Sequence, residues 1–438
     1  MSSLRSLRGF CQQGRPLPER PEAAVREPIT YSAILKQSSV RLLAICFFSF
    51  GAASHVLFGD DGDALPLQSR ETLVIQNGEP IVVPVEAFGE KYQFVLDTGC
   101  NLSIFDISFR ERLGEAVKRQ DSLTPTGVRS FEFFAAPELK IGHRSPEAFR
   151  SRDNVACADL SQAREAGRGD EMGIIGMDFL KSHVVRINFD KGIAQIKRTA
   201  IDNQGSPVRI QMNSERPWMR LAVSNDGNHN FLIDTGNVGE IYLNSKLFNR
   251  LSLRGRIVLK AVSRGAEIGK EIVIRTGVLD SLEFGDYRIN NVRVCEGTEN
   301  SVGLNFLSRF DVEFDFPNRT AYFKPGQQVN SPDRWNRAGF GVRRIKGKTI
   351  AAITDPAGTA AQKGICDDDE ILSVNGIPAS KMSLAQIRRL CSEPDADQLT
   401  IAFQRDGTET GAVLDLSKER EPFPTTPNLK TVKSIVDK

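Results

Sequence analysis

The tripeptide Asp-Thr-Gly occurs twice in this chain, at residues 97–99 and 234–236, and each copy closes a short apolar run. The run reads Phe-Val-Leu before the first copy and Phe-Leu-Ile before the second, a composition that favours β-strands. A single Asp-Thr-Gly after a strand is typical of an ordinary turn. Two copies with matched flanks indicate that one structural unit has been duplicated.

The match extends well beyond the tripeptides. Ahead of each copy, two β-rich segments flank a polar turn, which predicts a β-hairpin. Downstream of each copy, an apolar residue precedes a landmark glycine, Gly176 or Gly303, and a second predicted hairpin follows, turning at residues 190–192 or 317–319. The two copies are similar in size.

With these motifs, the chain resembles the retropepsin-like aspartic proteases over about residues 70–326. The resemblance implies a mainly β, pseudo-twofold bilobal aspartic-protease β-barrel fold. Half 1 would span residues 68–202 and half 2 residues 203–326. Both halves lie in one polypeptide, so we expect the fold to be completed within a monomer.

Peptide hydrolysis without a covalent intermediate needs a base that deprotonates water and an acid that protonates the carbonyl oxygen and the leaving nitrogen. Two facing carboxyl groups that share one proton supply both. The candidate catalytic residues are therefore Asp97 and Asp234. The supporting residues are glycines that permit close approach and, as the resemblance implies, threonines that hydrogen-bond across the axis: Thr98, Gly99, Thr235 and Gly236.

Several positions depart from the family pattern. Ser301 replaces an apolar residue, and Cys100 and Asn237 follow the tripeptides where a small or hydroxyl residue is usual. A thiol is a weak donor, so we expect the first carboxylate to be stabilised less as an anion, which Cys100→Ser would test. Flap candidates are residues 124–129 and 262–269, with an ordinary surface turn as the alternative for each.

A second series of motifs follows a polar linker at residues 327–335. Gly-Phe-Gly-Val at 339–342 precedes a small-residue helix, a Val-Asn-Gly turn and a predicted helix at 383–390. This series resembles a bacterial-type PDZ domain over residues 336–418, and the resemblance implies a small α+β PDZ-like domain.

Such a domain binds an extended peptide as an added strand, and its glycine loop holds a terminal carboxylate. The candidate peptide-binding residues are Gly339, Phe340, Gly341 and Val342. The last one departs from the common Gly-Leu-Gly-Phe pattern, and Asp368 stands where a glycine is usual. The alternative is a PDZ-shaped packing module that binds no peptide.

Composition excludes several classes of function. The 438 residues are 40% hydrophobic and carry a formal net charge of only +2, so the chain is globular and shows no nucleic-acid footprint. Histidines and cysteines lack metal-ligand spacing, so we expect no metal and no cofactor. We expect the cysteines to be mostly buried and free, with a pairing of Cys366 and Cys391 left open.

Residues 1–54 are expected to be a leader. Its apolar stretch at 42–53 follows Arg41 and precedes small residues, which indicates a signal peptide or an uncleaved signal anchor. Export to the periplasm or the cell exterior follows, with membrane anchoring as the alternative. The Pro-containing tail at 419–438 is expected to be disordered.

The resulting hypothesis is an exported aspartic endopeptidase whose PDZ-like domain binds substrate or a partner through a peptide segment or C-terminus. The alternative is a catalytically silent scaffold with the aspartic-protease fold, whose PDZ-like domain binds peptides. A third reading restricts cleavage to a few specific protein partners.

Overall fold

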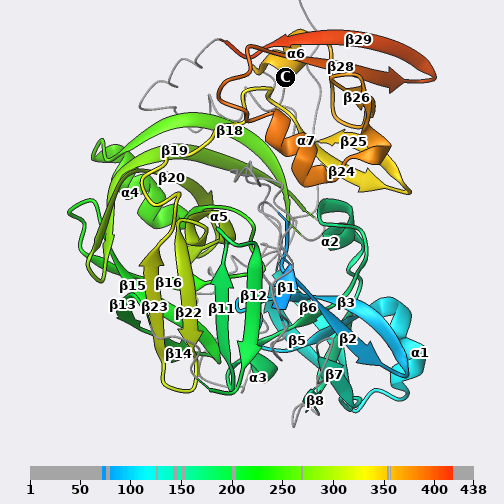
Figure 1. The fold of residues 1–438 in the computed structure, drawn as a ribbon. Coiled ribbons are helices and arrows are strands. Elements are labelled where there is room, and N and C mark those ends of the chain that lie inside the picture. Colours follow the sequence, from blue (N-terminus) through cyan, green and yellow to red (C-terminus); the bar gives the residue numbers. More distant parts are fainter. Residues whose placement is uncertain are drawn as a thin grey trace, which may run out of the picture. The chain divides into compact units, whose positions relative to one another are not determined.

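The computed structural model describes residues 72–74, 79–124, 127–141, 147–149, 154–199, 204–267, 270–352, 355 and 357–417. The expected leader and tail lie outside these residues. The described chain is mainly β, as predicted (Figure 1). None of its described helices is both long and apolar enough to cross a membrane.

Half 1 is built on a nine-stranded sheet of order β5-β6-β9-β4-β10-β3-β2-β7-β8. Its strands are β2 (Val82–Ala87), β3 (Glu90–Leu96), β4 (Ile104–Asp106), β5 (Lys118–Thr124), β6 (Gly127–Phe134), β7 (Leu139–Ile141), β8 (Glu147–Phe149), β9 (Val155–Ala158) and β10 (Glu171–Ile175). The helices are η2 (Ile107–Phe109), α1 (Arg110–Leu113), α2 (Ser161–Ala166) and α3 (Met177–Leu180).

Half 2 is built on an eight-stranded sheet of order β14-β15-β16-β21-β17-β20-β19-β18. Its strands are β14 (Gln211–Asn213), β15 (Arg216–Val223), β16 (Asn228–Ile233), β17 (Ile241–Asn244), β18 (Ile257–Glu267), β19 (Lys270–Phe284), β20 (Tyr287–Gly297) and β21 (Ser301–Val302). The helices are α4 (Ser245–Leu253) and α5 (Leu304–Leu307).

The central strands of the two sheets are arranged in the same way, as expected for a duplicated unit. β10 runs parallel to β3 and antiparallel to β4, and β21 runs parallel to β16 and antiparallel to β17. β9 and β20 also occupy matching places, beside β4 and β17. Cys157 and Cys295, on these two strands, are buried free thiols.

A third sheet joins the halves. Its order is β1-β12-β11-β22-β23-β13, with β1 (Thr72–Val74), β11 (Val184–Asn188), β12 (Ile193–Lys197), β13 (Ser206–Arg209), β22 (Phe310–Asp315) and β23 (Thr320–Pro325). The predicted second hairpin of each half supplies its centre, where β11 pairs antiparallel with β22 (Figure 1). Between these two strands, Nε and Nη2 of Arg186 donate hydrogen bonds to Oδ1 and Oδ2 of Asp311 at 2.9 and 2.6 Å.

The C-terminal domain has a sheet of order β24-β25-β26-β28-β29, with β27 paired to β26, and its own apolar core. Its strands are β24 (Gly341–Ile345), β25 (Lys348–Ala352), β26 (Glu370–Val374), β27 (Ile377–Pro378), β28 (Gln398–Arg405) and β29 (Thr408–Asp415). The helices are α6 (Thr359–Gln362), η3 (Ala379–Lys381) and α7 (Leu384–Leu390). α7 coincides with the predicted helix, and Ser383 caps its N-terminus.

The connector at residues 327–335 has no strand or helix, but half 2 holds it tightly. The buried Arg309 guanidinium donates to the carbonyl oxygens of Val329 and Ser331 at 3.2 and 2.9 Å, and pairs with the Asp333 carboxylate at 2.5 Å. Because one guanidinium hydrogen-bonds to several backbone carbonyl groups of this polar connector, the connector is fixed against half 2.

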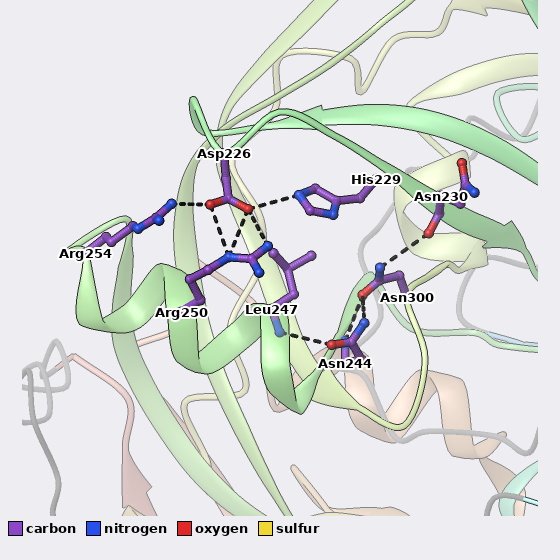
Figure 2. Close-up of polar contacts among 8 residues, drawn as sticks. All are labelled: Asp226, His229, Asn230, Asn244, Leu247, Arg250, Arg254 and Asn300. Carbon is purple, nitrogen blue, oxygen red and sulfur yellow. Dashed lines mark hydrogen bonds and ion pairs between the residues drawn. The ribbon is translucent and has the colours of Figure 1, made fainter. Parts of the chain in front are cut away.

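Asp226 connects the β15–β16 hairpin of half 2 to α4 (Figure 2). Its side chain lies in the turn between β15 and β16, is only 5% exposed, and accepts hydrogen bonds from His229, Arg250 and Arg254. The two arginines belong to α4 and its C-terminal cap. Donation by Arg250 lowers the pKa of Asp226. One carboxylate thus fastens the hairpin to the helix.

We predict that Asp226→Asn lowers the free energy of unfolding by about 1.5–3 kcal/mol at pH 7, the range for hydrogen bonds to charged groups. The native carboxylate has a lowered pKa, so its contribution is present above the ordinary pKa and is lost as pH falls through the folded-state pKa. Urea unfolding curves measure both effects. Asp280→Asn, at the exposed pair with Arg256, serves as control, and an equal loss in both variants would contradict the prediction.

Candidate functional site

The two Asp-Thr-Gly tripeptides meet at the junction of the halves. β3 ends at Leu96 and β16 ends at Ile233, so each tripeptide forms the loop directly after its strand. The backbone N–H of Asp97 donates to the Ile175 carbonyl, and that of Asp234 to the Val302 carbonyl, each at 3.0 Å. Each loop is therefore anchored to the apolar strand that precedes its landmark glycine.

The threonines join the two loops reciprocally. The Thr98 N–H donates to the Thr235 hydroxyl oxygen at 3.0 Å, and the Thr235 N–H donates to the Thr98 hydroxyl oxygen at 3.1 Å. Each hydroxyl then donates across the junction, Thr98 to the Ile233 carbonyl at 2.7 Å and Thr235 to the Leu96 carbonyl at 2.9 Å. Both side chains are fully buried. The four bonds hold the loops in one relative position.

The landmark glycines are required by close packing under these loops. A Cβ on Gly176 would lie 2.4 Å from the Leu102 carbonyl oxygen, and one on Gly303 would lie 2.3 Å from the Gly239 carbonyl oxygen. Backbone atoms at such distances leave no room for a side chain. The short helices α3 and α5 begin immediately after these glycines.

The structure brings the carboxyl groups of Asp97 and Asp234 together. Both side chains are 1% exposed, and a hydrogen bond joins the two groups. A Cβ built on Gly236 would lie 2.3 Å from Cγ and 2.5 Å from Oδ2 of Asp97. The absence of a side chain at Gly236 thus allows the carboxyl group of one half to lie against the loop of the other.

The environment of the pair favours the protonated form of Asp97. Burial raises the pKa of Asp97 well above its ordinary value, and the negative charge of Asp234 raises it further. The backbone N–H groups of Gly99 and Cys100 act in the opposite direction, because they donate to Oδ1 of Asp97 at 2.7 and 3.1 Å. Two buried carboxyl groups in contact hold a proton between them.

Cys100 contacts the pair through its backbone. Its thiol donates to the Leu102 carbonyl at 2.9 Å, and burial raises the thiol pKa well above its ordinary value. At the matching position of half 2, the Asn237 side-chain oxygen accepts from the Gly239 N–H at 2.8 Å. Both departures from the family pattern therefore shape the loop after the tripeptide.

A buried polar contact under each loop was missed by the sequence analysis. In half 1, the Ser103 hydroxyl donates to Asp178 at 2.7 Å and accepts from the Gly176 N–H at 3.2 Å. In half 2, Asn305 hydrogen-bonds to Glu240, and burial raises the Glu240 pKa to about 8. Ser103 and Glu240 stand equally far after their aspartates, and this spacing was the signal that could have revealed them.

Both flap candidates lie in β-hairpins. Residues 124–129 belong to the hairpin of β5 and β6, and residues 262–269 to the long hairpin of β18 and β19. The tips, at 125–126 and 268–269, lie outside the described residues.

In the C-terminal domain, the predicted glycine loop leads into the edge strand β24. Phe340 and Val342 are buried in the domain core, each 1% exposed. Gly339 has a φ of 80°, its N–H donates to the Asn336 side chain at 2.9 Å, and its carbonyl accepts from Asp355. These residues shape the loop, and β24, which follows it, packs against α7.

The cysteines of this domain are free: Cys366 is exposed and Cys391 is buried. The pairing left open by the sequence is therefore not formed. The expectation of mostly buried free cysteines is confirmed for the described residues.

We predict that Gly236→Ala separates the two acids. The added methyl group overlaps the Asp97 carboxyl group, so one loop must move, at a cost of about 1–3 kcal/mol of unfolding free energy. Gly411→Ala is the matched control, since its Cβ would meet no atom within 4 Å. Chemical unfolding measures the difference, and equal stability of the two variants would contradict the close approach.

We also predict that Asp97→Asn flattens the dependence of stability on pH. An acid whose folded-state pKa is raised contributes stability that is fully present below its unfolded pKa and is lost as pH rises through the folded-state pKa. The Asp97→Asn variant has no titratable group at this position, so it does not lose stability in this way as pH rises. Unfolding free energies measured between about pH 4 and pH 7 should fall less steeply in Asp97→Asn than in the wild-type chain. Parallel curves would refute the prediction.

Comparison with known proteins identifies one part of the chain. Residues 354–405 match the family model described as the PDZ domain. A comparison of the chain with curated proteins gave no match. The matched residues lie within the span 336–418 in which the sequence predicted such a domain, and the chain therefore contains a PDZ domain.

Proposed function

We propose that the chain is an aspartic endopeptidase in which Asp97 and Asp234 activate water for peptide-bond hydrolysis, while the PDZ domain binds a peptide segment of a substrate or partner. The observation that carries the proposal is the hydrogen-bonded, buried carboxyl pair, held across the junction by reciprocal threonine contacts.

The chemistry follows from the single shared proton. The ionised carboxylate removes a proton from a water molecule, and the oxygen of that water attacks the carbonyl carbon of the substrate. The protonated carboxyl group donates its proton to the carbonyl oxygen as negative charge develops there. The tetrahedral intermediate then collapses, and its nitrogen leaves after accepting a proton from the first acid. As the carbonyl group re-forms, one hydroxyl group of the intermediate returns a proton to the second acid, so both acids regain their starting protonation states with one proton between them.

The threonines act in this mechanism by positioning. The hydroxyl of each one is used by the opposite loop, so neither carboxyl group can shift without breaking a bond in the other half. General acid–base catalysis depends on such fixed geometry, because the proton donor and acceptor must lie within hydrogen-bond reach of the reacting atoms.

Export is part of the same proposal. It is supported by the apolar stretch at residues 42–53 behind Arg41, which has the length of a secretory signal. Among the described residues, four of the five cysteines are buried, so few of these thiols are accessible to an oxidising compartment.

The decisive test is cleavage of a reduced, carboxymethylated protein between about pH 4 and pH 7, followed by mass spectrometry of the fragments. We predict that Asp97→Asn and Asp234→Asn each lower the rate by about 10²–10⁴-fold, the contribution of a general acid or base. Asp280→Asn should leave it unchanged. Equal residual cleavage in the wild-type chain and both dyad variants would favour a silent scaffold whose PDZ domain binds peptides.

A further inference from the structure

Arg388 stands out on the groove helix of the PDZ domain. It lies on α7 and is 8% exposed, although an arginine on a domain surface ordinarily extends into water. Burial lowers its pKa to about 10, and the carboxylate of Glu79, at the start of half 1, opposes that shift. The effect of Glu79 shows that half 1 lies close to this side chain.

The Arg388 guanidinium connects three elements. One terminal nitrogen donates to the Val342 carbonyl at 2.9 Å and to the Ala166 carbonyl at 2.8 Å. Val342 belongs to β24, and Ala166 is the last residue of α2 in half 1. α2 also lies directly against β24. One side chain from the groove helix thus ties the groove strand to a helix from half 1.

The edge of β24 is where an extended peptide would bind. β24 is the terminal strand of its sheet, and β25 occupies its other side. An added peptide strand must hydrogen-bond to the outward-facing backbone groups of such an edge. In this structure the Val342 carbonyl is taken by Arg388, and α2 occupies the adjoining space.

We propose that α2 covers the peptide-binding groove of the PDZ domain, so that an extended peptide gains access only when α2 leaves the edge of β24. The groove then exists in two states, one covered by the chain's own helix and one open to peptide. A peptide binds only the open state, and its apparent affinity is reduced by the fraction of molecules that are covered.

The position of α2 also links the groove to the acid pair. Arg164 of α2 pairs with the buried Asp106, at the end of β4, at 2.6 Å. After α2, the chain turns under the Glu171 carboxylate, which accepts from the N–H groups of Arg168 and Gly169 at 2.6 and 2.8 Å. It then enters β10, whose Ile175 carbonyl holds the Asp97 N–H. Regulation of cleavage by peptide would rest on the proposed function, whereas covering of the groove does not.

The test uses the full chain carrying Asp97→Asn, so that the result is independent of hydrolysis. In this background, Arg388→Met removes the bridge from the PDZ side. Glu165→Pro breaks α2 from the half 1 side without altering the PDZ domain. Arg389→Met is the matched control, since this neighbouring arginine is partly exposed. The probe is a pool of fluorescein-labelled decapeptides that end in Val, Leu or Phe with a free carboxylate.

We expect Arg388→Met and Glu165→Pro each to bind the pool about tenfold more tightly by fluorescence anisotropy, because the covered fraction falls. The control should bind as the parent chain does. In hydrogen exchange, saturating peptide should protect residues 341–345 and speed exchange in residues 161–166 of the parent chain. Equal affinity in all four chains, absence of binding in all of them, or peptide protection of both segments would overturn the proposal.

Discussion

The reciprocal contact between Thr98 and Thr235 is the interaction on which the rest of the barrel depends. Each threonine gives its N–H to the other hydroxyl and its own hydroxyl to a carbonyl of the opposite strand. The loops that follow β3 and β16 are thereby held in a fixed relative position. The other features of the site, from the contact of the acids to the packing against Gly236, require that position.

Duplication explains why the site is symmetric in outline, and the sequence differences explain where it is not. Each half presents the same strand, loop and landmark glycine, but the polar contact under the loop is Ser103 with Asp178 in one half and Glu240 with Asn305 in the other. The half 2 version places a buried acid near Asp333 of the connector. The charge of Asp333, in the connector that leads to the PDZ domain, thus acts on the buried acid under the loop of half 2.

Periodic and local features made most of the fold predictable. The hairpins and the helix at 383–390 appear where the sequence pattern predicted them, because hydrophobic period, turn residues and helix caps depend on a few neighbouring residues. The candidate acids and threonines were also found from the sequence. The contacts under the loops were not predicted. The equal spacing of Ser103 and Glu240 from their aspartates marks the two positions, but neither residue type indicates which side chain it contacts.

By itself, the sequence determined which segments become strands and which residues follow them, because these depend on side chains close together along the chain. Only the tertiary structure decided that the Asp97 carboxyl group lies against Gly236 and that Arg388 reaches the carbonyl of Ala166. The first contact arises from packing between two halves. The second contact is made to a backbone carbonyl oxygen. Every residue type has such an oxygen, so the amino-acid sequence does not indicate this contact.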